Sequence, residues 1–377
     1  MIYLDNSATT APDEGVLTSF LEVNRRFYAN PASIHLAGKQ TESLLEKSRQ
    51  QILSIVGALD GEVIFTSGGT ESNNLAVIGF AQAFRTRGNH IITTEIEHPS
   101  VLRAMEYLEM QGFEVDYLAV DKQGMISLDE LENKLRKETI LVSIMHVNNE
   151  IGTVQPIAAC ARLIREKTRA VFHSDTVQSF GKLPVSLKDT GLDAITISAH
   201  KINGLKGSGA LIVRKGVKPV AVNFGGGQEQ GLRSGTVAVP NAVALAKAMR
   251  ITARDEEHVV FKQWRNRLVD FMKQYEDILV LAPDKAAPHI LSIAFYKIKG
   301  EVAVNYFQEN GITVSTSSAC SSKSGTAGHV IEAIRVPEKF KNGVIRISFG
   351  ENNVEQHIVK LEQVCAQFME LLGRGNQ

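Results

Sequence analysis

Between about residues 60 and 215, short apolar segments alternate with longer segments whose apolar residues lie three and four positions apart. EVIFTS, residues 62–67, is a segment of the first kind and predicts a buried strand. ESNNLAVIGFAQAFRTRG, residues 71–88, is of the second kind and predicts a helix that ends at a glycine. Because such alternation is typical of a mainly parallel sheet with helices on both faces, we predict an α/β fold.

The same alternation continues along the chain. Further strands are expected at residues 90–96, 113–120, 139–147, 170–175, 193–199 and 210–215, and further helices at residues 100–112, 127–137 and 157–168. Residues 237–275 have a long helical pattern with few helix-breaking residues, which suits a connector between domains. After this connector, the pattern of strand, helix, strand and helix predicts a smaller α+β domain.

Composition excludes several classes of function. The 377 residues include 41 basic and 41 acidic side chains, so net charge predicts no binding to nucleic acid or to an anionic membrane. No apolar run approaches the roughly 18 residues that span a bilayer, and the first residues do not resemble a signal peptide. The three cysteines are odd in number and widely spaced, which predicts neither a disulfide framework nor a metal site and favours a reducing cytoplasm.

In α/β folds, ligands bind where the carboxyl ends of the strands gather, so residues that follow each strand are the first candidates for a site. GGTESNN follows the first strand, and its glycines before a helix suit either an anion-binding turn or simply a tight turn. His98 follows the second strand and precedes a proline. It could stack on a ligand or shuttle protons, and it could equally cap the helix.

Later strand ends carry more polar side chains. NNEIG, residues 148–152, brings neutral amides. Asp175 ends an apolar strand, where a buried carboxylate needs a cation such as a ligand group or an arginine. Lys201 ends another strand and is preceded by Ser198 and His200. Pyridoxal phosphate needs a lysine to form a Schiff base and a partner for its ring nitrogen. The strand ends together match this cofactor, because they supply a lysine, a carboxylate, a histidine that could stack on the ring and an anion-binding turn.

The motifs resemble those of the cysteine desulfurase family, within the class V aminotransferase-like enzymes that depend on pyridoxal 5'-phosphate. The matching stretches are YLDNSATT, NPASIHLAG, FTSGGTESNN, EIEHPSV, HVNNEIGTVQPI, HSDTVQSFGK, SAHKINGLKG, GGGQEQGLRSGT, SSACSS and IRISFG, from Tyr3 to Gly350. The resemblance implies aminotransferase fold type I. It also implies an N-terminal arm of residues 1–15 associated with the small domain, a large cofactor-binding domain of residues 16–255 and a small domain of residues 256–377.

The resemblance implies a role for each candidate residue. Lys201 would bind the cofactor covalently and move protons, and Asp175 would pair with its ring nitrogen. His98 would be a catalytic residue that stacks on the ring and could shuttle protons. The remaining contacts would be those of Asn149 and Gln178 to the ring oxygen, of Gly69, Thr70, Ser198 and His200 to the phosphate, and of Thr236 to the phosphate of the other subunit of a homodimer. Arg346 would bind the substrate carboxylate, with Asn149 nearby.

Cys320 lies in VSTSSACSSKSGTAGH, among small and polar residues that a core cysteine would not have. The resemblance implies that this cysteine, on a mobile loop of about residues 315–329, takes sulfur from L-cysteine as a persulfide and leaves L-alanine. The sulfur would pass to an acceptor protein, either an iron–sulfur scaffold or an enzyme of tRNA or cofactor thiolation. Cys160 and Cys365 lie in amphipathic helical patterns and are predicted to be buried.

Two other functions remain open. The first is a selenocysteine lyase or another enzyme of the class V aminotransferase-like fold, for which Cys320 would be dispensable. The second is a non-catalytic scaffold for sulfur transfer, which the presence of Lys201, Asp175, His98 and Arg346 disfavours.

Overall fold

The computed structural model describes residues 1–253, 258–316 and 328–375. In these ranges, seven strands form a large sheet in the order β2-β8-β7-β6-β5-β3-β4. Its strands are β2 (Glu62–Thr66), β3 (His90–Thr94), β4 (Glu114–Leu118), β5 (Thr139–Ser143), β6 (Val171–Asp175), β7 (Ala194–Ser198) and β8 (Gly209–Val213). All neighbours from β4 to β7 are parallel, and β8 runs antiparallel to both β7 and β2. The predicted α/β fold with a mainly parallel sheet is confirmed, although β5 ends at Ser143 instead of continuing to residue 147.

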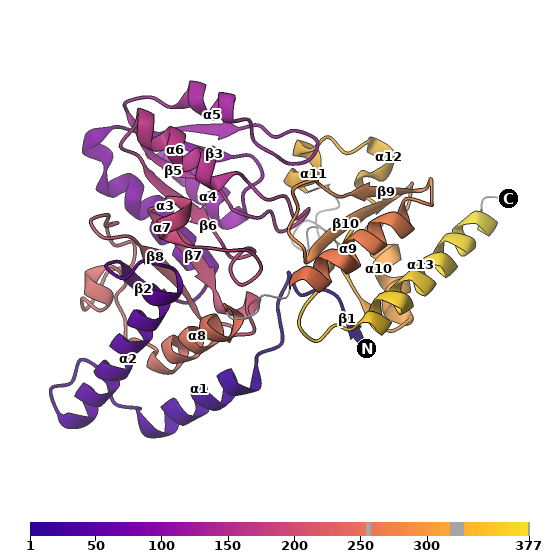
Figure 1. Ribbon diagram of the computed structural model, residues 1–377. Helices are drawn as coiled ribbons and strands as arrows, with labels where there is room; N and C mark the ends of the chain where they lie inside the picture. Colours follow the sequence, from indigo (N-terminus) through magenta and orange to yellow (C-terminus); the bar gives the residue numbers. More distant parts are fainter. Residues whose placement is uncertain (254–257, 317–327, 376–377) are drawn as a thin grey trace.

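Helices cover both faces of this sheet (Figure 1). The helices of this part of the chain are α1 (Glu14–Arg26), which packs on α8, α2 (Leu36–Ile55), α3 (Gly69–Ala83), α4 (Pro99–Met110), α5 (Leu128–Lys134), α6 (Ile157–Lys167), α7 (Leu187–Thr190) and α8 (Val239–Thr252), with short 3-10 turns η1 (Arg85–Arg87), η2 (Ala199–Lys201) and η3 (Glu229–Gly231). Successive residues of a strand point to opposite faces. Ile91 therefore packs in the core that includes Phe80 of α3, whereas Ile92 packs in the core that includes Ile164 of α6.

The C-terminal part has its own sheet, in the order β12-β13-β10-β9, and its own core around Phe295, Phe307 and Phe368. Its strands are β9 (Ile278–Leu281), β10 (Ile290–Phe295), β12 (Ser315–Thr316) and β13 (Val344–Ser348). Its helices are α9 (His258–Met272), α10 (Gly300–Glu309), α11 (His329–Ala333), α12 (Glu338–Lys341) and α13 (Glu355–Gly375). The expected connector consists of two helices, α8 and α9, in the described residues.

The first residues of the chain join the two parts. β1 (Ile2–Tyr3) pairs in parallel with β11 (Ile312–Thr313) of the C-terminal part. A few residues later, the backbone N–H of Thr10 donates to the carbonyl oxygen of His200 at 2.8 Å, in the large part. The domain boundary between residues 255 and 256 stays a prediction, because it lies outside the described residues. No helix in the described ranges is long and apolar enough to cross a membrane.

Candidate active site

The predicted site residues gather at one edge of the large sheet, where its parallel strands end. Asp175 is the last residue of β6, and Ser198 is the last residue of β7, directly before the turn that holds Lys201. Helix α3 begins with Gly69 three residues after β2. His98 is the N-cap of α4, with its Nδ1 accepting from the backbone N–H of Ser100, so its capping role is confirmed.

The carboxylate of Asp175 is buried and has neutral partners. Asn73 Nδ2 donates to its Oδ2 at 2.7 Å, and the backbone N–H of Val177 donates to its Oδ1 at 2.9 Å. The sequence leads us to expect a cation here, but no Lys, Arg or His of the described residues forms an ion pair with Asp175. A buried carboxylate without a cation is suited to bind a positively charged group of a ligand.

The ammonium group of Lys201 contacts carbonyl oxygens. Its Nζ donates to the main-chain oxygen of Ser7 and, at 2.8 Å, to that of Ala8. Burial and the charge of Arg346 lower the pKa of Lys201, Asp5 and Asp175 oppose them, and the net result is a pKa of about 8. A lysine with such a pKa has a substantial fraction of neutral, nucleophilic amine near neutral pH.

The N-terminus of α3 has no side-chain cap. Gly68 has a positive φ of 151° and precedes Gly69, whose absent Cβ would lie 3.1 Å from Val177 Cγ2 and 3.5 Å from Ser198 Cβ. The first N–H groups of a helix lack intrahelical partners and carry partial positive charge, so this end of α3 favours an anion. Thr70, the next residue, is exposed.

Three other residues, which are predicted to contact the phosphate or the ring, either bond to the N-terminal segment or are exposed. Gln178 is buried, and its Nε2 donates to the carbonyl oxygen of Ser7 at 3.0 Å. His200 Nδ1 lies 3.2 Å from Thr9 Oγ1, and burial together with the charges of two lysines lowers the pKa of His200 to about 4. Thr236 is exposed on this chain.

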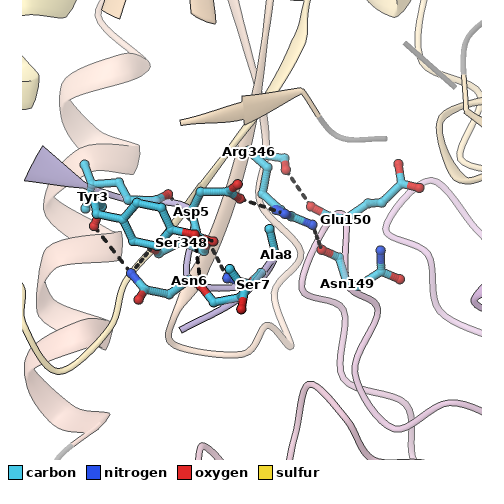
Figure 2. Close-up of polar contacts among 12 residues, drawn as sticks. Tyr3, Asp5, Asn6, Ser7, Ala8, Asn149, Glu150, Arg346 and Ser348 are labelled. Carbon is cyan, nitrogen blue, oxygen red and sulfur yellow. Dashed lines mark hydrogen bonds and ion pairs between the residues drawn. The ribbon is translucent and has the colours of Figure 1, made fainter. Parts of the chain in front are cut away.

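Arg346 comes from β13 and therefore belongs to the C-terminal part of the chain (Figure 2). Its Nη2 donates to Asp5 Oδ1 at 2.9 Å, and its Nη1 donates to the carbonyl oxygen of Asn149 at 2.7 Å. Its Nε is buried and has no hydrogen-bond partner in the described structure. The Nε–H of the guanidinium group is thus an unused donor. Asn149 contributes its backbone oxygen here.

Four residues at the site were not predicted as site residues: Asp5, Asn73, Glu97 and Ser100. Glu97 is fully buried, and its Oε1 accepts from Met145 N–H at 2.7 Å and from Thr94 Oγ1 at 2.9 Å. Its Oε2 has no partner, and burial raises the pKa of Glu97 to about 8, with the charge of Asp175 acting in the same direction. Only its place beside His98, after a predicted strand, could have indicated it.

Cys320 lies outside the described residues, so the structure does not test its place in the site. The other two cysteines are free and buried, and burial raises the pKa of each thiol to about 12. Their predicted burial is confirmed. A cavity of about 1050 Å³ beside Lys182 and Arg265 lies elsewhere, because none of the predicted site residues lines it.

These groups fit pyridoxal phosphate. The partly buried Lys201 amine can form a Schiff base with its aldehyde, and the buried carboxylate of Asp175, which pairs with no cation of the described residues, can pair with a protonated ring nitrogen. The N-terminus of α3, with Ser198 against Gly69, can receive its phosphate.

Comparison with known proteins identifies the class. Residues 2–361 match the family described as Aminotransferase class-V, and the chain belongs to this family of pyridoxal-phosphate-dependent enzymes. Within it, the chain belongs to the cysteine desulfurases. "Cysteine desulfurase IscS 1" of Archaeoglobus fulgidus is 39% identical over 375 residues, 99% of this chain and 98% of the relative.

Two solved structures are also similar. A "NIFS-LIKE PROTEIN" has a TM-score of 0.91 and 37% sequence identity, and the match covers 98% of this chain and 99% of that one. A structure titled "SspA in complex with cysteine" has a TM-score of 0.83 and 34% sequence identity, and the match covers 94% of this chain and all of that one (100%).

Proposed function

We propose that this protein removes the sulfur atom from L-cysteine and releases L-alanine. The observation that carries the proposal is a pair of residues, Lys201 and Asp175. Lys201 is a partly buried lysine on carbonyl oxygens, and Asp175 is a buried aspartate without a cation among the described residues. The similarity to proteins named cysteine desulfurase, and to one solved with cysteine, supports L-cysteine as the substrate.

The cofactor, when bound, supplies an aldehyde that captures the substrate amine and a ring that stores electrons. Asp175 keeps the ring nitrogen protonated, and Asn73 holds the carboxylate in place. Lys201 moves protons at the substrate α-carbon, because its lowered pKa allows the amine to accept and return a proton near neutral pH. Gln178 and Asn149 would bind the ring oxygen, and Gly69, Thr70, Ser198 and His200 would hold the phosphate.

Arg346 binds the substrate carboxylate. Its buried, unpaired Nε supports this role, because a carboxylate would satisfy a donor that the described residues leave without a partner. Asp5 and the carbonyl oxygen of Asn149 hold the other guanidinium nitrogens. The substrate is thus fixed between the C-terminal part, which supplies Arg346, and the large sheet, which supplies Lys201.

Cys320 accepts the sulfur. Its thiolate forms a sulfur–sulfur bond with the substrate sulfur while the substrate's carbon–sulfur bond breaks, and the electron pair and proton end on the carbon that becomes the alanine methyl group. Cys160 and Cys365 cannot take this role, because both thiols are buried and their pKa values are raised to about 12.

The persulfide then passes to an acceptor protein for iron–sulfur cluster assembly or for tRNA or cofactor thiolation, in a reducing cytoplasm. The enzyme works as a homodimer in which Thr236 reaches the phosphate in the other subunit. The exposure of Thr236, and of Tyr28, Ile34 and Phe224, supports a subunit interface, since large apolar side chains on a surface favour association.

Product analysis tests the proposal. Purified protein with pyridoxal phosphate, L-cysteine and a thiol reductant should form alanine and sulfide in equal amounts. Cys320→Ala should form almost none, and Cys160→Ala, the matched loss of a buried thiol, should remain active. If Cys320→Ala kept the activity of the unchanged protein, or if no alanine formed, the proposal would be wrong, and selenocysteine would be tested as the substrate.

A further inference from the structure

Two site groups, His98 and Asp175, are joined by an unbroken chain of hydrogen bonds inside the protein. Asn73, on the second turn of α3, places Nδ2 2.7 Å from Asp175 Oδ2 and 2.9 Å from Ser100 Oγ. Ser100 Oγ in turn lies 2.8 Å from His98 Nδ1. Asn73 and Ser100 are buried, with exposed fractions of 1% and 8%, so solvent offers these groups few alternative partners.

The chemistry of each group fixes the direction of every bond. A carboxylate only accepts, so the nitrogen of the Asn73 amide must face Asp175, and its second hydrogen then points to Ser100 Oγ. Because Ser100 Oγ accepts there, its own proton is available for His98 Nδ1. The backbone N–H of Ser100 also points to His98 Nδ1, at 3.2 Å.

We infer that Asn73 and Ser100 are positioning residues that hold His98 as the neutral tautomer with its proton on Nε2. Two donors converge on Nδ1, so a proton on that nitrogen would face the Ser100 N–H. The structure therefore assigns His98 the role of a fixed hydrogen-bond donor and stacking ring. A base at Nε2 would need the opposite tautomer.

The charges around His98 are compatible with this assignment. Burial lowers the pKa of His98, Asp175 opposes the effect, and Lys201 and His329 reinforce it. The neighbouring carboxyl of Glu97, whose pKa burial raises to about 8, is protonated at neutral pH and adds little negative charge. Protonation of His98 is thus disfavoured both by its surroundings and by the two donors on Nδ1.

This inference rests on the proposed function only for its consequence, which is that His98 and Lys201 have different roles in the reaction. With His98 fixed as a donor at Nε2, the transfer of protons to and from the substrate carbon falls to Lys201. The tautomer itself is a property of the protein and can be measured without turnover.

Nitrogen-15 NMR of the cofactor-loaded protein, labelled at histidine and assigned with His98→Gln, tests the inference. The expected spectrum has an unprotonated Nδ1 and a protonated Nε2 for His98 at neutral pH. Ser100→Ala removes the hydroxyl donor and should shift both nitrogen signals toward a mixture of tautomers, whereas Ser100→Thr, which keeps the hydroxyl, should restore them. Ser48→Ala, a buried serine of α2 whose Oγ donates to the carbonyl oxygen of Leu44, is the matched control.

Two results would overturn the inference: a protonated Nδ1 in the unchanged protein, or His98 signals that Ser100→Ala does not move. Failure of the proposed function is distinguishable, because it would appear as absent alanine formation in a protein whose His98 signals are as expected.

Discussion

Asp5 and Arg346 form an ion pair of 2.9 Å between residues 341 positions apart in the chain. The side chain of Arg346 is 6% exposed and that of Asp5 is 16% exposed, so water screens the pair weakly. Asp5 thereby fixes the guanidinium group whose unused Nε faces no described partner.

Asp5→Asn should therefore weaken substrate binding and stability together. The change leaves a buried guanidinium without its counter-charge, and loss of one partner of such a pair costs about 3 kcal/mol. We expect a higher KM for L-cysteine with a smaller change in kcat, and a lower free energy of unfolding. Asp60→Asn is the control, because its pair with Lys215 is exposed. Equal KM values for Asp5→Asn and the unchanged enzyme would contradict the role of Asp5.

Lys201→Met should remove a pH dependence of stability from the cofactor-free protein. The pKa of Lys201 is about 8 in the folded chain and 10.5 ordinarily, so between these pH values the unfolded chain binds more protons. Stability of the unchanged protein should rise across that window by up to about 1.4 kcal/mol per pH unit relative to Lys201→Met. Urea unfolding at pH 7 to 10 measures this difference. If the free energies of unfolding of the two proteins changed in parallel with pH, Lys201 would not be desolvated.

Glu97→Gln should remove a pH dependence of stability that has the opposite sign. The pKa of Glu97 is raised from 4.5 to about 8, so its contribution to stability is lost as the pH rises through this window. Glutamine keeps an acceptor for Met145 N–H and cannot ionise. The variant should become more stable than the unchanged protein by up to about 1.4 kcal/mol per pH unit between pH 5 and 8. A constant difference across these pH values, measured by urea unfolding, would refute the raised pKa.

Gly209→Ala should loosen the cofactor without removing any group that touches it. A Cβ at Gly209, the first residue of β8, would lie 2.6 Å from Gly68 Cα, just before the N-terminus of α3. Overpacking costs about 1–3 kcal/mol, and relief by moving Gly68 would shift the N–H groups that receive the phosphate. Titration with pyridoxal phosphate should show a raised Kd. Gly207→Ala, where a Cβ meets open space at a φ of 73°, should strain the backbone and leave the Kd unchanged.

The sequence predicts those parts of the site that follow from strand order. Asp175, Ser198 and Lys201 could be predicted because the carboxyl ends of parallel strands meet at one edge. The helix cap at His98 could also be predicted, since a histidine before a helix that begins with proline is a local sequence feature.

Other parts depend on contacts that no local pattern encodes. Asn73 lies within a helix, where only the rotation of α3 against β6 directs it to Asp175. The partners of Lys201 are backbone oxygens, which every residue possesses, so their identity as Ser7 and Ala8 leaves no signal in the side chains. The pairing of Asp5 with Arg346 requires knowledge of how distant segments pack.

The contacts of the N-terminal arm have a consequence for co-translational folding. β1 pairs with β11, and Asn6 Nδ2 donates to the carbonyl oxygen of Ser348 at 3.0 Å, so the arm completes its contacts only after these later segments have been made. Contacts between such distant segments form late, because closing long loops is slow. A nascent chain can fold its large sheet first, but Lys201 acquires its two carbonyl partners in their final place only after translation passes β13. The reactive amine is therefore set in its resting position only after the strand that carries Arg346 has been made.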